Sequence, residues 1–91
     1  MEVTAQQHHM NKPRKASAKI LRLLAFNLKR LREERGWSQL NLARRCGFPK
    51  RYIVHIEQGR VNITLRNLEI VANVLKCSIR DLLAPFPQDG K

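Results

Sequence analysis

Four side chains between positions 50 and 55 could read the edges of nucleic-acid bases. Lys50, Arg51, Val54 and His55 would face outward from one short helix. Arg51 can donate two hydrogen bonds to N7 and O6 of a guanine, and Val54 can contact the methyl group of a thymine. Lys50 and His55 can each bind either a base or a phosphate. We take these residues as candidates for base reading, with solvated surface as the alternative for each.

Further polar side chains are candidates for phosphate contacts, which position a protein on DNA without reading sequence. Gln39 would begin a helix, where free N–H groups and the helix dipole favour a phosphate. Tyr52 could contribute its hydroxyl group, and Arg66 lies near the start of a later helix. The complete set is Gln39, Tyr52, Gln58, Arg60, Asn62 and Arg66. We interpret Arg44 and Arg45, at the far end of the helix that Gln39 begins, as solvated surface.

No arrangement of residues indicates an enzyme. The sequence has no Ser/His/acid set, no metal-ligand spacing such as CxxC or HExxH and no glycine-rich phosphate loop. The adjacent His8 and His9 lack further ligands and indicate a metal site only weakly. Cys46 and Cys77 take apolar-face positions, and we interpret them as reduced core residues. We therefore expect no catalytic residues, no cofactor and no metal.

The charge of the chain indicates a polyanionic partner. Its 91 residues allow one domain with a modest core. Lys and Arg number 18 against 7 Asp and Glu, which gives a formal net charge of +11. Such an excess suits either nucleic acid or an anionic membrane surface. The sequence contains no apolar run long enough to span a membrane and no signal-peptide pattern, so we expect a cytoplasmic protein.

The segment Ser38–Arg60 predicts two short helices joined by a tight turn. Ser38 is a good N-cap for a helix over 39–46, which Gly47 ends. Pro49 suits the first turn of the second helix, because its missing N–H costs nothing there. This second helix should end at Gly59. The spacing is that of a helix-turn-helix.

Other segments complete an all-α prediction. Three more helices follow capping residues: 18–35 after Ser17, 65–76 after Thr64 and 79–84 after Ser78. We expect a compact five-helix bundle over 18–86, preceded by a flexible basic arm over 1–17 and followed by a tail over 87–91. The arm could follow phosphates or enter a minor groove, or it could be a solvated tail.

Apolar side chains indicate which faces are buried. An amphipathic stripe on the first helix consists of Leu21, Leu24, Leu28 and Leu31. Leu23 and Phe26 widen this stripe, and would contact either the C-terminal helix or a second subunit. Leu65 is expected on the inner face of the 65–76 helix. Trp37 is expected to be a core aromatic residue at a corner of the fold.

The elements resemble a known family, the Cro and phage-repressor type (XRE) helix-turn-helix domains. The similarity runs from about Phe26 to Leu83, through LKRLREERGWSQLNLARRCG, YIVHIEQGR and TLRNLEIVANVLKCSIRDLL. Ile63 departs from it, since many members have a proline there, and so does the long basic N-terminus. The resemblance implies a lambda-repressor-like fold and a sequence-specific DNA-binding transcriptional regulator. It also implies a partly buried structural ion pair between Arg32 and Glu57.

We expect a repressor that binds double-stranded DNA, at a palindromic operator, as a homodimer. Two recognition helices about one DNA turn apart, roughly 34 Å, would supply the specificity that one lacks. Candidates for the dimer surface are Ile79, Leu82, Leu83 and Phe86, with closing of the core as their alternative.

Several alternatives remain open at this point. The same domain serves in antitoxins of toxin–antitoxin pairs and in restriction–modification controllers, and a toxin or RNA polymerase could be a protein partner. A non-specific nucleic-acid-binding adaptor would explain the charge without sequence reading. A cationic helix on a membrane surface would require the stripe Leu21–Leu31 to be exposed.

Overall fold

The computed structural model describes residues 17–85, and all of their regular structure is helical. The helices are α2 (Ala18–Glu34), α3 (Gln39–Cys46), α4 (Lys50–Glu57), α5 (Leu65–Leu75) and α6 (Ile79–Leu82). These five helices confirm the predicted all-α fold, and no strand occurs between residues 17 and 85. The expected arm over 1–17, apart from Ser17, lies outside the described residues, as do Phe86 and the expected tail.

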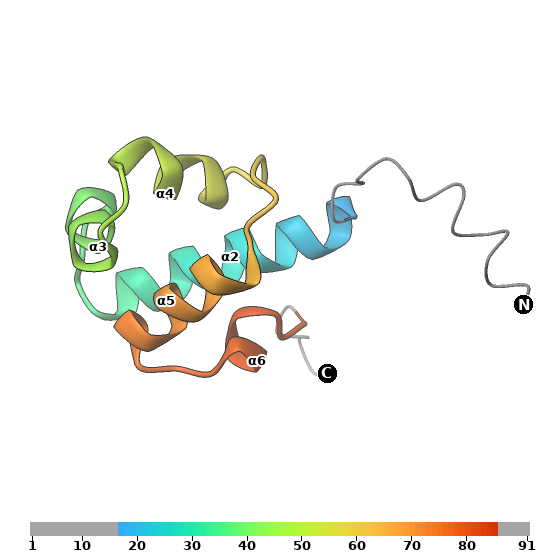
Figure 1. Cartoon of the computed structure of the whole chain (residues 1–91). Coiled ribbons are helices and arrows are strands. Elements are labelled where there is room, and N and C mark those ends of the chain that lie inside the picture. Colours follow the sequence, from blue (N-terminus) through green and yellow to red (C-terminus); the bar gives the residue numbers. More distant parts are fainter. Residues whose placement is uncertain (1–16, 86–91) are drawn as a thin grey trace, which may run out of the picture.

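The longest helix, α2, is the element around which the others are arranged (Figure 1). It packs against α4 and against α6, while α3 contacts both α4 and α5. In Figure 1, α3 and α4 lie in the upper left part of the molecule, and α6 lies at the bottom. The two consecutive helices of the predicted helix-turn-helix are therefore presented together on one side of the protein.

Polar side chains cap four of the helices, as the sequence predicts. Each accepts a hydrogen bond from the N–H group three residues further on, and the capping residues are Ser17, Ser38, Thr64 and Ser78. The N–H of Ser78 donates in return to the carboxylate of Asp81, which completes a capping box. This backbone hydrogen bond lowers the pKa of the Asp81 carboxyl below its usual value.

Several helix boundaries differ slightly from the prediction, by one or two residues. Pro49 is the N-cap of α4 rather than a residue of its first turn, so the helix begins at Lys50. The last helix ends at Leu82 instead of Ala84, because the residue before a proline disfavours the helical region. Helix α5 ends one residue before Lys76, which adopts the left-handed conformation with φ 57°. These shifts do not alter the order or the packing of the elements.

The core forms where the apolar faces of the helices meet. Leu28, Leu42, Ile53 and Leu75 are each 0% exposed and bring together α2, α3, α4 and α5. Leu82 is also 0% exposed and belongs to the same cluster. It therefore closes the core from α6 and is not available to a second subunit, which corrects its selection as a dimer residue.

The apolar pattern also misplaces Leu65. It was expected on the inner face of α5, yet it is 78% exposed. The reason is its position as the first residue of the helix, ahead of the point where α5 enters the core at Leu68. Phe26 is 41% exposed and Leu23 is half-buried, so the described residues cover the wide stripe of α2 only in part. Trp37 is half-buried against the core, close to its expected place.

Polar side chains of α2 and of its C-cap residue satisfy carbonyl groups at the C-terminal ends of other helices. Asn27 is 1% exposed, and its amide nitrogen donates to the carbonyl oxygens of Leu82 at 3.0 Å and Ala84 at 2.8 Å. Arg35 donates to the carbonyl oxygen of Leu75 at the end of α5. These bonds fasten the ends of α5 and α6 to the central helix.

Both cysteines pack at the edge of the core as free thiols. Burial raises the pKa of the Cys46 thiol from its usual 9.0 to about 11. Burial also raises the pKa of Cys77. Because the thiolate is the reactive form, both residues should be chemically inert near neutral pH.

Replacing Asn27 by alanine should lower the free energy of unfolding by about 2–3 kcal/mol, because two C-terminal carbonyl groups of the α6 region lose their donor. Urea denaturation of both proteins measures the difference. Asn73→Ala, at an exposed position of α5, is the control and should change stability by less than about 0.5 kcal/mol. If Asn27→Ala lowered the free energy of unfolding no more than the control, the hydrogen bonds from Asn27 to the α6 region would not stabilise the fold.

At about pH 8, Cys46 should react with iodoacetamide about a hundredfold more slowly in the folded protein than in the unfolded protein, because its thiolate fraction is smaller. Its raised pKa also means that its contribution to stability is complete below pH 9 and is lost as the pH rises towards 11. Mass spectrometry of alkylated protein in a Cys77→Ser background follows this one thiol. Equal rates in both states would show that Cys46 is not protected.

Candidate nucleic-acid interface

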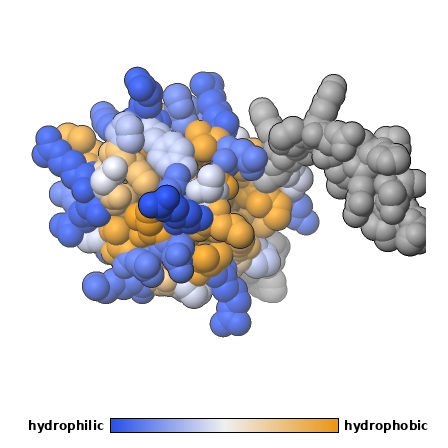
Figure 2. Space-filling model, viewed as in Figure 1, coloured by the Kyte–Doolittle hydropathy of each residue, from blue (hydrophilic) through white to orange (hydrophobic). Residues whose placement is uncertain are grey.

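Helix α4 turns one face into the core and leaves the other accessible. Ile53 and Ile56 are 0% and 1% exposed. The base-reading candidates lie on the rest of its surface, with exposed Lys50 and Arg51 and half-buried Val54 and His55. Figure 2 shows hydrophilic side chains projecting along the upper edge of the molecule, where Figure 1 places α3 and α4. The structure therefore brings these candidates together on one accessible helix.

The turn between α3 and α4 holds the two helices at close range. Gly47 ends α3 in the left-handed conformation with φ 79°. The N–H of Phe48 then donates to the carbonyl oxygen of Ala43 at 2.9 Å. Ala43 is fully buried, so a larger side chain there would push the helices apart. The ring of Phe48 meets that of Tyr52 edge-on, with centroids 4.9 Å apart, and steadies the first turn of α4.

The acid at the end of α4 is paired inside the protein. Nε of Arg32 donates to Oε2 of Glu57 at 2.6 Å, and Nη2 donates to Oε1 at 3.0 Å. The two side chains are 9% and 4% exposed. The hydrogen bond with Glu57 raises the pKa of Arg32, so the arginine remains charged. The pair joins α2 to α4 and keeps the carboxylate of Glu57 away from the accessible face.

Gln39 belongs to the same network. From the first position of α3, its Nε2 donates to Oε1 of Glu57 at 3.1 Å. Nη1 of Arg32 donates to the carbonyl oxygen of Trp37 at 2.7 Å, just ahead of this helix. A phosphate contact of Gln39 must therefore use the second N–H of its amide, together with free backbone N–H groups at the start of α3.

Tyr52 is oriented by a residue that the sequence pattern did not single out. Nδ2 of Asn67 donates to the hydroxyl oxygen of Tyr52 at 2.9 Å. Because the hydroxyl accepts this bond, its own proton is available to an outside acceptor such as a phosphate oxygen. The backbone of Asn67 is held by the cap at Thr64. No local signal could have identified Asn67, since the contact depends on how α4 meets α5.

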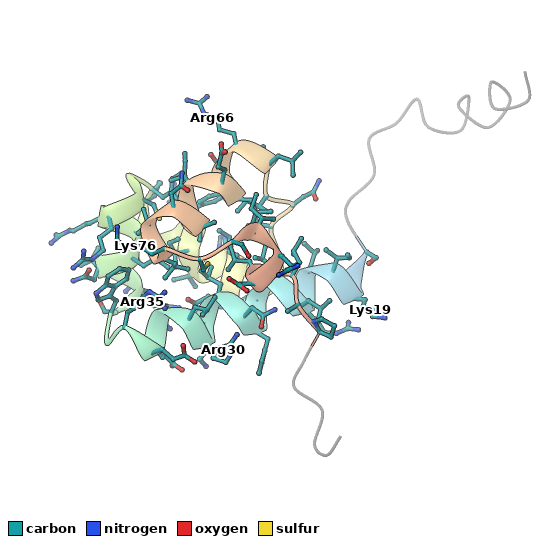
Figure 3. The ribbon with its side chains drawn as sticks, turned by 90° about the horizontal axis from the view of Figure 1, so that it is seen from below. Lys19, Arg30, Arg35, Arg66 and Lys76 are labelled. Atoms are coloured by element: carbon teal, nitrogen blue, oxygen red, sulfur yellow. The ribbon has the colours of Figure 1, made fainter. Side chains whose placement is uncertain are left out.

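The remaining phosphate candidates lie on the connection from α4 to α5 and on the turn that follows it. Gln58, Arg60 and Asn62 are exposed along this connection, and Arg66 is exposed on the first turn of α5. Figure 3 shows the side chain of Arg66 extending away from the body of the protein. These side chains are thus accessible, and Arg66 is positioned to reach an external partner.

Arg44 and Arg45, interpreted as solvated surface, are both exposed. Arg45 nevertheless has defined contacts. Its guanidinium carbon lies 4.0 Å from the centroid of the Trp37 ring, and its Nε donates to Oδ1 of Asn41 at 2.5 Å. Stacking on an aromatic face and a hydrogen bond to a neighbour therefore set the direction of this side chain.

Two further features concern membrane spans and metal ligands. Within the described part of the chain, no helix is long and apolar enough to cross a membrane. Residues 17–85 also lack a group of three or more His, Cys, Asp or Glu residues that could hold a metal ion.

Glu57→Ala should destabilise the protein by about 3–5 kcal/mol, because it leaves the buried charge of Arg32 without a partner. Urea denaturation measures the loss. Glu34→Ala is the matched control, since Glu34 forms an exposed pair with Arg30 whose loss should cost less than about 1 kcal/mol. If the two variants lost equal stability, the pair at Glu57 would not be a structural constraint.

Comparison with known proteins identifies the family. The helix-turn-helix family model HTH_3 matches residues 28–82. A hypothetical transcription factor of Neisseria meningitidis serogroup B is 42% identical over 67 residues, which make up 74% of this chain and 62% of that protein. The chain therefore covers less than two thirds of the length of this relative.

Solved structures agree with the sequence match. The crystal structure of the hypothetical transcription factor NHTF from Neisseria has a TM-score of 0.72 and 34% identity, over 82% of this chain and 87% of that one. The restriction-modification controller protein C.AhdI from Aeromonas hydrophila has a TM-score of 0.66 and 32% identity, over 68% of this chain and 94% of that one. The chain belongs to the HTH_3, or XRE-type, family of DNA-binding helix-turn-helix transcriptional regulators.

Proposed function

We propose that this protein is a sequence-specific transcriptional repressor that binds a palindromic operator as a homodimer. The accessible face of α4 carries the proposal. Lys50 and Arg51 are exposed in its first turn, while its acid, Glu57, is paired with Arg32 inside the protein. A helix with this distribution can enter a major groove without bringing an unpaired carboxylate towards the phosphates.

Within this proposal the side chains have separate tasks. Arg51 binds a guanine through N7 and O6, a contact that discriminates against other bases by about 1–3 kcal/mol. Gln39 at the start of α3 and the hydroxyl of Tyr52 bind phosphates and set how deeply α4 enters the groove. The bond from Asn67 supports this task for Tyr52, because it leaves the hydroxyl proton free to be donated.

A dimer supplies the specificity that one recognition helix lacks. Proteins of this family bind DNA and often act as dimers. The surface proposed for pairing is α6 with Ile79 and Leu83, which are half-buried, together with Phe86 beyond the described residues. Figure 1 places α6 at the opposite side of the molecule from α4, so pairing there would leave α4 accessible. The two copies of α4 would meet half-sites about one DNA turn, roughly 34 Å, apart.

Selection of binding sites from a random pool of DNA duplexes tests this function. The wild-type protein should enrich a palindrome, since two identical subunits read two identical half-sites. Arg51→Ala should relax one symmetric position of that palindrome and weaken binding about 10- to 100-fold, the equivalent of one bidentate base contact. Arg44→Ala, which removes an exposed arginine from α3, is the control and should leave the motif unchanged.

The outcomes separate the proposal from a non-specific adaptor. Binding that survives only at low salt, with no enriched motif, would reveal an adaptor that contacts phosphates alone. An enriched motif without two-fold symmetry would retain sequence reading but contradict the homodimer.

A restriction–modification controller is the second candidate. The observation that favours it is the likeness to C.AhdI, 94% of whose length aligns with this chain. A reporter gene placed downstream of the selected motif distinguishes the two functions. Repression by the wild-type protein supports our first proposal. Activation from the same site would favour a controller that switches genes on.

A further inference from the structure

An open surface hollow of about 330 Å³ lies beside α3, lined by side chains that the proposed DNA contacts do not use. Its lining residues are Ser38, Leu40, Asn41, Arg44 and Arg45, and we call it the α3 hollow. Two guanidinium groups and no carboxylate line it, so it attracts negative charge. Leu40 is 41% exposed and contributes an apolar surface to the same hollow.

The two arginines differ in how they are held. Arg45 is positioned by the ring of Trp37 and by Oδ1 of Asn41, which accepts from its Nε. The guanidinium group of Arg44 has no hydrogen bond or ion pair with any of residues 17–85. A guanidinium whose direction is already set loses little freedom on binding, and its terminal nitrogens match the two oxygens of a carboxylate. The hollow therefore offers one prearranged cationic group and one free cationic group.

The geometry of α3 directs the hollow away from the proposed DNA contacts. Leu40 and Arg44 are four residues apart and share the face opposite buried Leu42. Gln39, the phosphate candidate of this helix, is turned towards Glu57 instead. The α3 hollow should therefore remain accessible while α4 lies in a major groove.

We propose that the α3 hollow binds an acidic segment of a partner protein. One carboxylate of the segment pairs with Arg45, a second pairs with Arg44, and an apolar side chain packs on Leu40. Complementary charge favours an acidic occupant. The exposed leucine favours a peptide over a DNA backbone, because phosphates and sugars offer no comparable apolar side chain.

Fluorescence of Trp37 reports directly on this site, because Trp37 is the only tryptophan of the chain and lies beneath Arg45. The full-length protein is titrated with a synthetic helical peptide that carries glutamates and leucines on one face. A peptide with glutamines in place of the glutamates serves as its control. The glutamate peptide should give a saturable change in fluorescence, and the glutamine peptide should give none.

Matched variants locate the binding. Arg44→Glu should weaken binding of the glutamate peptide at least about tenfold, which is the expected loss for a charge-assisted hydrogen bond. Leu40→Gln should also weaken it, which tests the apolar contact with a second exposed residue. Arg80→Glu makes the same charge change on α6 and should alter the affinity by less than about twofold, since distant exposed charges are screened.

Other results would overturn the proposal. Equal losses of peptide affinity in Arg44→Glu and Arg80→Glu would mean that binding depends on the net charge of the protein and not on the α3 hollow. Absence of any saturable change would mean that the hollow takes no acidic segment. If duplex DNA displaced the peptide, and Arg44→Glu weakened the binding of DNA and of peptide alike, the α3 hollow would be a phosphate site.

Discussion

A single buried carboxylate determines how the side of this protein that carries the base-reading candidates is assembled. Glu57 accepts two hydrogen bonds from Arg32 and one from Gln39, so α2, α3 and α4 converge on it. Such a pair contributes little net stability when complete, but removing one partner leaves an unpaired charge, which is costly. It therefore acts mainly as a constraint on where the helices lie. The same pairing keeps negative charge away from the face that carries Arg51.

The accessible face of α4 depends on a second, smaller constraint from α5. Asn67 fixes the hydroxyl of Tyr52, and the ring of Tyr52 meets Phe48 in the turn before α4. Polar contacts inside the fold thus set the direction of the helix, while Lys50 and Arg51 at its start remain exposed for a ligand. This division suits recognition, because a rigid frame limits the ordering that binding requires.

Local sequence signals predicted most of the fold. Capping residues and helical periodicity gave α3 its observed limits of 39–46 and placed the other helices within about two residues. Periodicity cannot tell where a core ends, so Leu65 was expected to be buried, and Leu82 was a candidate for the dimer surface with closing of the core as its alternative. Asn27 was missed because its role depends on α6 folding back onto α2. The assignment of Arg51 to a base stays a prediction, since the protein alone contains no base.

Methylation interference on the selected site measures directly whether α4 reads bases in the major groove. Methylating N7 of one guanine in each half-site should block binding of the wild-type protein. Arg51→Ala should lose sensitivity at that guanine alone, because N7 is one of the two acceptors that Arg51 would use. Binding that tolerates N7 methylation at every guanine of the site would contradict major-groove reading by this arginine.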